Sequence, residues 1–122
     1  MRATVPDIAS ERELLTFVYD AFNGRDIEPI LARMHPRVEW PNGMEGGWVY
    51  GREGVRSYWM RQWDLLNPRV EPVRYETDND GRVVVDVHQV VCNLDGKVLL
   101  DRTIQHVYRI TDGLIRHMEI RE

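Results

Sequence analysis

The chain is poor in the features that mark secreted, membrane-spanning or nucleic-acid-binding proteins. Its 122 residues include one cysteine, Cys92, which excludes an internal disulfide. No apolar run approaches the ~18 residues of a transmembrane helix, and no apolar run follows a basic patch near the start. The 20 acidic residues outnumber the 16 basic ones, which argues against a nucleic-acid partner. We therefore expect a cytoplasmic protein with neither a membrane nor a nucleic acid as its partner.

The usual signatures of metal, phosphate and nucleophile sites are also missing. The four histidines show no close ligand spacing with cysteine or with paired carboxylates, so we expect no metal. The glycines of residues 41–51 are not followed by the Lys-Ser/Thr pair of a phosphate loop. No Ser-His-Asp or Cys-His arrangement is visible. Any activity is therefore expected to proceed without a cofactor.

Two halves with different hydrophobic periods follow one another in what we expect to be a single domain, residues 1–122. Ser10, with Glu13 three residues later, predicts the start of a first helix, and Gly24 predicts its end. Asp26 predicts a second, short helix that ends before Pro36. A third helix is expected over 52–66, and strands over 37–40, 71–78, 82–93, 98–110 and 114–121, with a long loop over 41–51. Helices followed by strands indicate an α+β domain with an antiparallel sheet.

The Asp95-Gly96 turn predicts the register of the two longest strands. If it is a two-residue turn, Leu94 faces Lys97, and Gln89 and Val85 lie opposite Arg102 and His106. The face with these residues is the more apolar one, so we expect it to lie against the helices. The opposite face carries Val84, Val90, Leu99 and Val107 among polar residues, which favours a homodimer formed through it.

Three polar residues of the predicted inner face, Gln89, Arg102 and His106, stand among valine, isoleucine, leucine and tyrosine. An apolar pocket with a few convergent polar groups is the usual form of a small-molecule site. His106 is the candidate acid/base, because its ordinary pKa lies near neutrality. The alternatives are a core histidine bonded to a backbone carbonyl, and an Arg102 that reaches water.

Large apolar side chains accompany these polar residues. They predict a site for a small apolar or aromatic molecule, and plain core packing is the alternative, above all for Trp59 and Trp63. Trp48 lies in the glycine-rich loop and is a candidate lid. The candidate substrate-binding residues are Trp40, Tyr58, Trp59, Gln89, Arg102, Tyr108 and Met118.

The order of elements resembles the NTF2-like superfamily, and most closely its SnoaL-like and ketosteroid-isomerase-like members. The resemblance runs from about Glu11 to Glu122 and rests on four motifs: NGRD, VEWP, YGREGVRSYW and the closing YRITDG segment. It implies a cone-shaped α+β barrel in which three N-terminal helices pack in a strongly curved antiparallel or mixed sheet. The cavity would open at the wide end. Members are often homodimers.

The resemblance also allows a comparison with the ketosteroid isomerases. Their base, an aspartate before a proline, corresponds to Trp40, and their aspartate oxyanion donor corresponds to His106. Their tyrosine donor corresponds to a position near Phe17, and we expect Tyr19 to lie on another face of the helix. These differences argue against steroid isomerisation by that mechanism.

SnoaL-like polyketide cyclases use a carboxylate with a histidine, and no inward carboxylate stands out in this chain. Asp86, Asp101 and Glu39 are expected to face outward, Glu45 lies in the loop, and Glu122 is terminal.

Three hypotheses follow. The first is a cofactor-independent isomerase, cyclase or dehydratase acting on a small apolar carbonyl compound, with His106 as acid/base and Arg102 or Gln89 stabilising an enolate oxygen. The second is a non-catalytic carrier or sensor, and the third is a dimeric interaction module with a vestigial cavity. The inward histidine favours the first, and the missing inward carboxylate favours the second.

Overall fold

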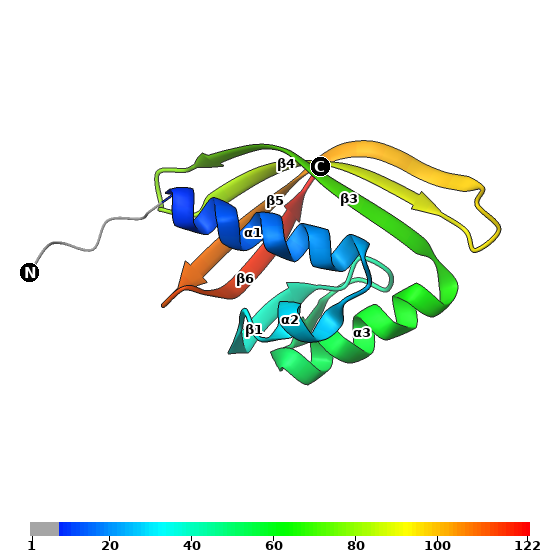
Figure 1. The fold of residues 1–122 in the computed structure, drawn as a ribbon, viewed down its shortest axis with the longest axis horizontal. Helices are drawn as coiled ribbons and strands as arrows, with labels where there is room; N and C mark the ends of the chain where they lie inside the picture. The colour runs from blue at the N-terminus through cyan, green and yellow to red at the C-terminus, as the bar shows by residue number, and fades with distance from the viewer. Residues whose placement is uncertain (1–7) are drawn as a thin grey trace, which may run out of the picture.

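The computed structural model describes residues 8–122, which form three helices and one six-stranded sheet (Figure 1). The helices are α1 (Ile8–Asn23), α2 (Ile27–Leu31) and α3 (Gly51–Leu65). The strands are β1 (Met34–Pro41), β2 (Trp48–Tyr50), β3 (Asn67–Thr77), β4 (Val83–Cys92), β5 (Val98–Thr111) and β6 (Leu114–Arg121). The predicted α+β class is confirmed.

The sheet is mixed and open. Its strand order is β2-β1-β6-β5-β4-β3, and only the β1–β6 pair is parallel. The long strands curve around α1, which lies across the concave face, whereas α2 and α3 lie beside β1 (Figure 1). The β4–β5 hairpin extends beyond the other strands at the right of Figure 1. This is the cone of the predicted NTF2-like fold.

The predicted register of β4 and β5 is confirmed along most of their length. Val85 pairs with His106, and Gln89 pairs with Arg102. The prediction is wrong at the hairpin tip, where Cys92 pairs with Val98 and the register shifts by one residue. The connection is longer than two residues, because Asn93 N–H donates to Lys97 O and Gly96, at φ 92°, takes the left-handed conformation. Leu99, predicted on the outer face, therefore lies at the shift and borders the cavity described below.

Three further local predictions are corrected. Helix α1 already includes Ile8 and Ala9, so Ser10 lies inside the helix and is not its cap. Strand β1 begins at Met34, because it pairs with β6 and carries Pro36 within it. The predicted loop contains strand β2, which pairs with β1 and places Trp48 beside His117, with ring centroids 5.0 Å apart. Trp48 is therefore not a lid on the cavity.

The two faces of the sheet differ in what covers them. The inner face of β4 and β5 packs against α1, with Val83, Val85, Val87 and Ile104 at most 2% exposed. On the outer face Val84 and Val107 are also buried, so less apolar surface is open there than the sequence suggests. No helix of residues 8–122 is long and apolar enough to cross a membrane.

Candidate functional site

A cavity of about 310 Å³ lies between α1, α3 and the concave face of the sheet. This volume is at the lower end of the range for small-molecule sites. The structure brings all eight predicted site residues to its wall, although it does not test their roles: Trp40, Tyr58, Trp59, Gln89, Arg102, His106, Tyr108 and Met118. Further lining residues that the sequence did not single out include Tyr19, Met44 and Gln62.

The cavity has a closed end and an open end, which β5 connects. Alternation along this strand points Arg102, Ile104, His106 and Tyr108 to the same face. Tyr108, His106 and Ile104 are 1%, 6% and 2% exposed, whereas the Arg102 side chain is 34% exposed. Tyr108 and His106 thus lie deep in the cavity, and Arg102 lies near its mouth.

A chain of three side chains runs through the deep end of the cavity. The Tyr108 hydroxyl donates to the Tyr19 hydroxyl at 2.8 Å, and the Tyr19 hydroxyl lies 2.8 Å from Nδ1 of His106. Since the Tyr19 oxygen accepts the hydrogen bond from Tyr108, the Tyr19 O–H is free to donate a hydrogen bond to Nδ1. A neutral imidazole that accepts at Nδ1 carries its hydrogen on Nε2. Nε2 forms no hydrogen bond to residues 8–122. Its N–H is therefore a free hydrogen-bond donor on the cavity wall.

The network is electrically neutral at physiological pH. Burial lowers the pKa of His106 from 6.5 to about 4, because an imidazolium would lose its hydration without gaining a counter-charge. Burial likewise raises the pKa of Tyr19 and of Tyr108, which keeps both hydroxyls protonated. The deep end therefore offers a ligand a neutral hydrogen-bond donor.

The carboxylates considered from the sequence lie elsewhere. Glu39 bonds to His117 Nδ1 at 2.8 Å, Asp86 accepts from Gln105 and Asp101 contacts His88, all on the outer face. Glu45 accepts from Asn42 and Arg61 on the loop after β1. No aspartate or glutamate is among the described residues that line the cavity.

Aromatic rings form the walls around the His106 donor. Trp40 meets Trp59 edge to face at 5.3 Å between ring centroids, and Trp59 meets Phe22 in the same way at 5.2 Å. Tyr58 is 4% exposed, and its hydroxyl accepts from Gly43 N–H at 3.0 Å, which fastens the loop after β1 to α3. Trp63 packs against the core but is not part of the cavity wall. The cavity therefore has flat, apolar walls of the kind that suits a flat ligand.

Gln89 and Arg102 lie together at the mouth. Arg102 Nε donates to Gln89 Oε1 at 2.9 Å, and Arg102 Nη1 lies 3.2 Å from a carboxylate oxygen of Glu122. The guanidinium is held in place on one side by the amide and on the other by an exposed carboxylate.

Tyr19 is the main residue that the sequence reasoning missed. The expectation that it lies on another face of the helix is wrong, because it contacts both His106 and Tyr108. The signal was present in the sequence, since Tyr19 is four residues after Leu15 and three before Phe22, so helical spacing places the three side chains on one face. Phe17 instead lies outside, beneath the guanidinium of Arg33. A tyrosine of the first helix therefore does line the cavity, with its hydroxyl bonded to His106 and Tyr108.

Nothing in the described part of the chain resembles a metal centre. No group of three or more His, Cys, Asp or Glu residues within 8–122 is arranged to hold a metal ion.

The sequence profile of the SnoaL-like domain matches residues 16–118. The chain belongs to the SnoaL-like family. The matched segment runs from the first helix to Met118, so it includes all eight predicted site residues. Comparison with curated proteins returned no significant match.

Among solved structures, this SnoaL-like protein is similar to TerC, which was co-crystallised with polyporic acid. The two are 32% identical, with a TM-score of 0.78 over 91% of this chain and 89% of TerC. A putative polyketide cyclase from Sinorhizobium meliloti is 18% identical, with a TM-score of 0.76 over 92% of this chain and 98% of that one. The epoxide hydrolase/cyclase-like enzyme SalBIII is 17% identical, with a TM-score of 0.80 over 95% and 92%. The last two similarities show the shared fold.

Proposed function

We propose that this SnoaL-like protein is a cofactor-independent isomerase, cyclase or dehydratase that acts on a flat, mostly apolar carbonyl compound bound in the cone. The observation that carries the proposal is the position of His106, whose Nε2 has no hydrogen bond to the described chain and faces an apolar, aromatic cavity. Nε2 is not among the fully buried polar atoms that lack a partner, so its N–H is accessible to a ligand or to water in the cavity.

The proposed role of His106 follows from its protonation state. The neutral imidazole donates its Nε2 hydrogen to the carbonyl oxygen of the ligand, and this bond strengthens as negative charge develops on that oxygen. Enolisation, aldol-type ring closure and loss of a β-hydroxyl all develop charge there. The proton that leaves the carbon atom in these reactions passes to a water molecule in the open cavity, because no carboxylate lines its wall. Tyr19 and Tyr108 hold the imidazole in the tautomer that donates from Nε2.

The flat aromatic walls and the similarity to TerC support the proposed ligand class. TerC was co-crystallised with polyporic acid, and at 32% identity over most of both chains it is a reasonable guide to ligand type. The similarity therefore supports an aromatic ligand for the cavity of this protein.

One observation favours the alternative of a non-catalytic carrier. No carboxylate lines the cavity, and burial makes His106 a weak base, so no strong base is at hand for proton removal. A carrier would use the same donor to hold a carbonyl oxygen without accelerating any reaction.

The test uses 2-acetylnaphthalene, a flat ketone, in two measurements. Infrared spectroscopy of the bound ketone should show its carbonyl stretch at lower frequency, and His106→Ala should abolish that change. Proton NMR in deuterated water should show faster exchange of the methyl protons, and His106→Ala should remove most of the acceleration, because acid/base groups contribute about 10²–10⁴-fold.

His88→Gln is the matched control, since His88 lies on the outer face of β4 beside Asp101. It should change neither measurement. A carbonyl shift without faster exchange would support the carrier, and a ketone that binds without any shift would overturn the role of His106.

A further inference from the structure

The mouth of the cavity carries a charge that the proposed chemistry does not use. Arg102 is the one charged side chain among the described residues that line the cavity. It lies on the inner face of β5 between Leu100, which also lines the cavity, and buried Ile104. A charge on the wall of an apolar cavity is partly removed from water, which is unfavourable unless an anion lies nearby.

The partners of Arg102 fix its guanidinium but leave part of it free. Nε donates to Gln89 Oε1 at 2.9 Å, and Nη1 contacts Glu122 at 3.2 Å. Nη2 has no partner among residues 8–122, although a guanidinium can bind a carboxylate through two parallel hydrogen bonds. Because the Gln89 amide orients the group from the neighbouring strand, little side-chain freedom remains to be lost when an anion binds.

Glu122 shows that a carboxylate can approach this guanidinium. Its side chain is 74% exposed, so its ion pair with Arg102 is a surface contact that water screens and that contributes little to stability. A ligand carboxylate enclosed by the cavity walls would be better shielded from water and would replace Glu122.

We propose that the substrate is an aromatic carbonyl compound with an acidic group at its far end, and that Arg102 binds this group as the carbonyl oxygen meets His106. The inference rests on the function proposed above and adds the substrate class. Arg102 and His106 are four residues apart on one strand, so their Cα atoms are about 13 Å apart. The ligand is therefore elongated, with polar oxygens at both ends and an apolar body between them.

A matched pair of probes tests this class. The acid is 4′-acetylbiphenyl-4-carboxylic acid, which carries a ketone and a carboxylate at opposite ends, and its neutral match is 4-acetylbiphenyl. Dissociation constants follow from quenching of tryptophan fluorescence, since Trp40 and Trp59 line the cavity. The acid should bind the wild-type protein roughly 10- to 100-fold more tightly, which is the usual range for charge-assisted hydrogen bonds.

Variants assign the preference to Arg102. Arg102→Gln should remove the preference for the acid and leave the affinity for 4-acetylbiphenyl within about twofold. Arg109→Gln is the control, because it removes one positive charge from an exposed position on the same strand. Glu122→Gln should tighten binding of the acid alone, since it removes the competing carboxylate.

The outcomes separate this inference from the function on which it rests. Equal affinities for the two probes, with no effect of Arg102→Gln, would overturn the acidic substrate and leave the carbonyl chemistry of His106 intact. Failure of both probes and of 2-acetylnaphthalene to bind would overturn both proposals. An acid preference that survives Arg102→Gln but is lost in Arg109→Gln would place the anion on the outer face and overturn the inference.

Discussion

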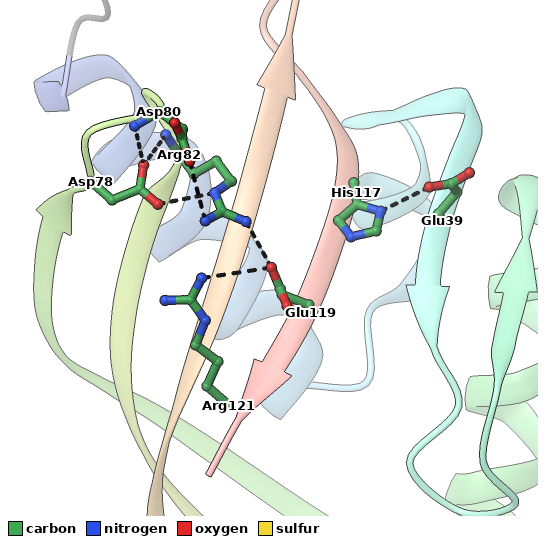
Figure 2. Close-up of polar contacts among 7 residues, drawn as sticks. All are labelled: Glu39, Asp78, Asp80, Arg82, His117, Glu119 and Arg121. Atoms are coloured by element: carbon green, nitrogen blue, oxygen red, sulfur yellow. Dashed lines mark hydrogen bonds and ion pairs between the residues drawn. The ribbon is translucent and has the colours of Figure 1, made fainter.

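The two faces of one sheet solve the problem of polar side chains in opposite ways. On the inner face, Tyr108, Tyr19 and His106 satisfy one another in a neutral chain at the closed end of the cavity. On the outer face, charged side chains form ion pairs: Arg82 contacts Asp78 within the β3–β4 connection and Glu119 on β6, and His117 contacts Glu39 on β1 (Figure 2). Residues adjacent in sequence thus lie in two different environments, one with neutral hydrogen bonds and one with ion pairs, because side chains alternate along each strand.

The difference has energetic consequences. A polar group that loses its partner inside costs about 1–3 kcal/mol, whereas an exposed ion pair contributes about 0–1 kcal/mol because water replaces the lost partner. Matched substitutions on the two faces should therefore change the free energy of unfolding by different amounts, with the larger changes on the inner face.

Two neighbouring residues of β5 allow the inner and outer faces to be compared directly. Ile104, which is 2% exposed, faces the core, and Thr103 beside it faces outward. Ile104→Ala should lower the free energy of unfolding by about 2–5 kcal/mol, because it removes buried methyl groups and leaves a cavity. Thr103→Ala should change it by no more than about 0.5 kcal/mol. Urea denaturation measures both, and equal effects would contradict the assignment of the two faces.

The sequence alone predicts which residues of β4 and β5 lie on each face, because a turn signal and the alternation of side chains along a strand are sufficient. The pairing of Gln89 with Arg102 and of Val85 with His106 followed from Asp95-Gly96 and alternation alone. The register fails only at the hairpin tip, where Asn93 Oδ1 accepts from both Asp95 and Lys97 N–H and supports a longer connection. A side chain that caps its own turn is a local effect that strand periodicity does not contain.

The second prediction concerns pH and the buried imidazole. His106 has a pKa of about 4 in the folded protein and near 6.5 when unfolded, so between these values the unfolded chain binds the additional proton. The contribution of the neutral His106 to stability is therefore complete above pH 6.5 and is lost as the pH falls toward 4. The loss is roughly 3 kcal/mol, from the difference between the two pKa values.

His106→Gln isolates that contribution. The difference in unfolding free energy between the wild type and this variant should move by roughly 3 kcal/mol against the wild type as the pH falls from 7 to 4. Urea denaturation across this range measures it. A difference that is independent of pH would mean that the folded protein keeps a charged imidazole.

The third prediction concerns the link between helix α1 and strand β5. Tyr19→Phe removes the partner of both His106 Nδ1 and the Tyr108 hydroxyl, and should lower the free energy of unfolding by about 1–3 kcal/mol. Tyr108→Phe is the milder control, since Tyr19 can still donate to His106. Nitrogen NMR of the imidazole should show hydrogen on Nε2 in the wild type and a mixture of tautomers in Tyr19→Phe. An unchanged tautomer would show that Tyr19 does not set it.

The position of Tyr19 marks the limit of prediction by resemblance. Comparison with the isomerases pointed to Phe17, although helical spacing from Leu15 and Phe22 points to Tyr19. The hydrogen bonds join residues 87 and 89 positions apart, so only the packing of α1 on the sheet reveals them.

The homodimer expected through the outer face stays a prediction, which sedimentation at micromolar concentration can test. The homodimer was expected because the outer face carries apolar side chains. Val84 and Val107 are already buried within one chain, which weakens that argument.

The smallest expected effect is that of the ion pair between Arg82 and Glu119. Arg82 Nη1 and Glu119 Oε1 are 2.8 Å apart, and the contact joins the residue just before β4 to strand β6 (Figure 2). Their side chains are 20% and 34% exposed, so water and salt screen the attraction. Glu119→Gln should cost at most about 1 kcal/mol, and less at high salt. A double-mutant cycle with Arg82→Gln isolates the pair from the contacts of Arg82 with Asp78 and Asp80. A coupling as large as the loss in Ile104→Ala would mean that the outer face is covered by a partner, because a pair shielded from solvent is the one kind that reaches such values.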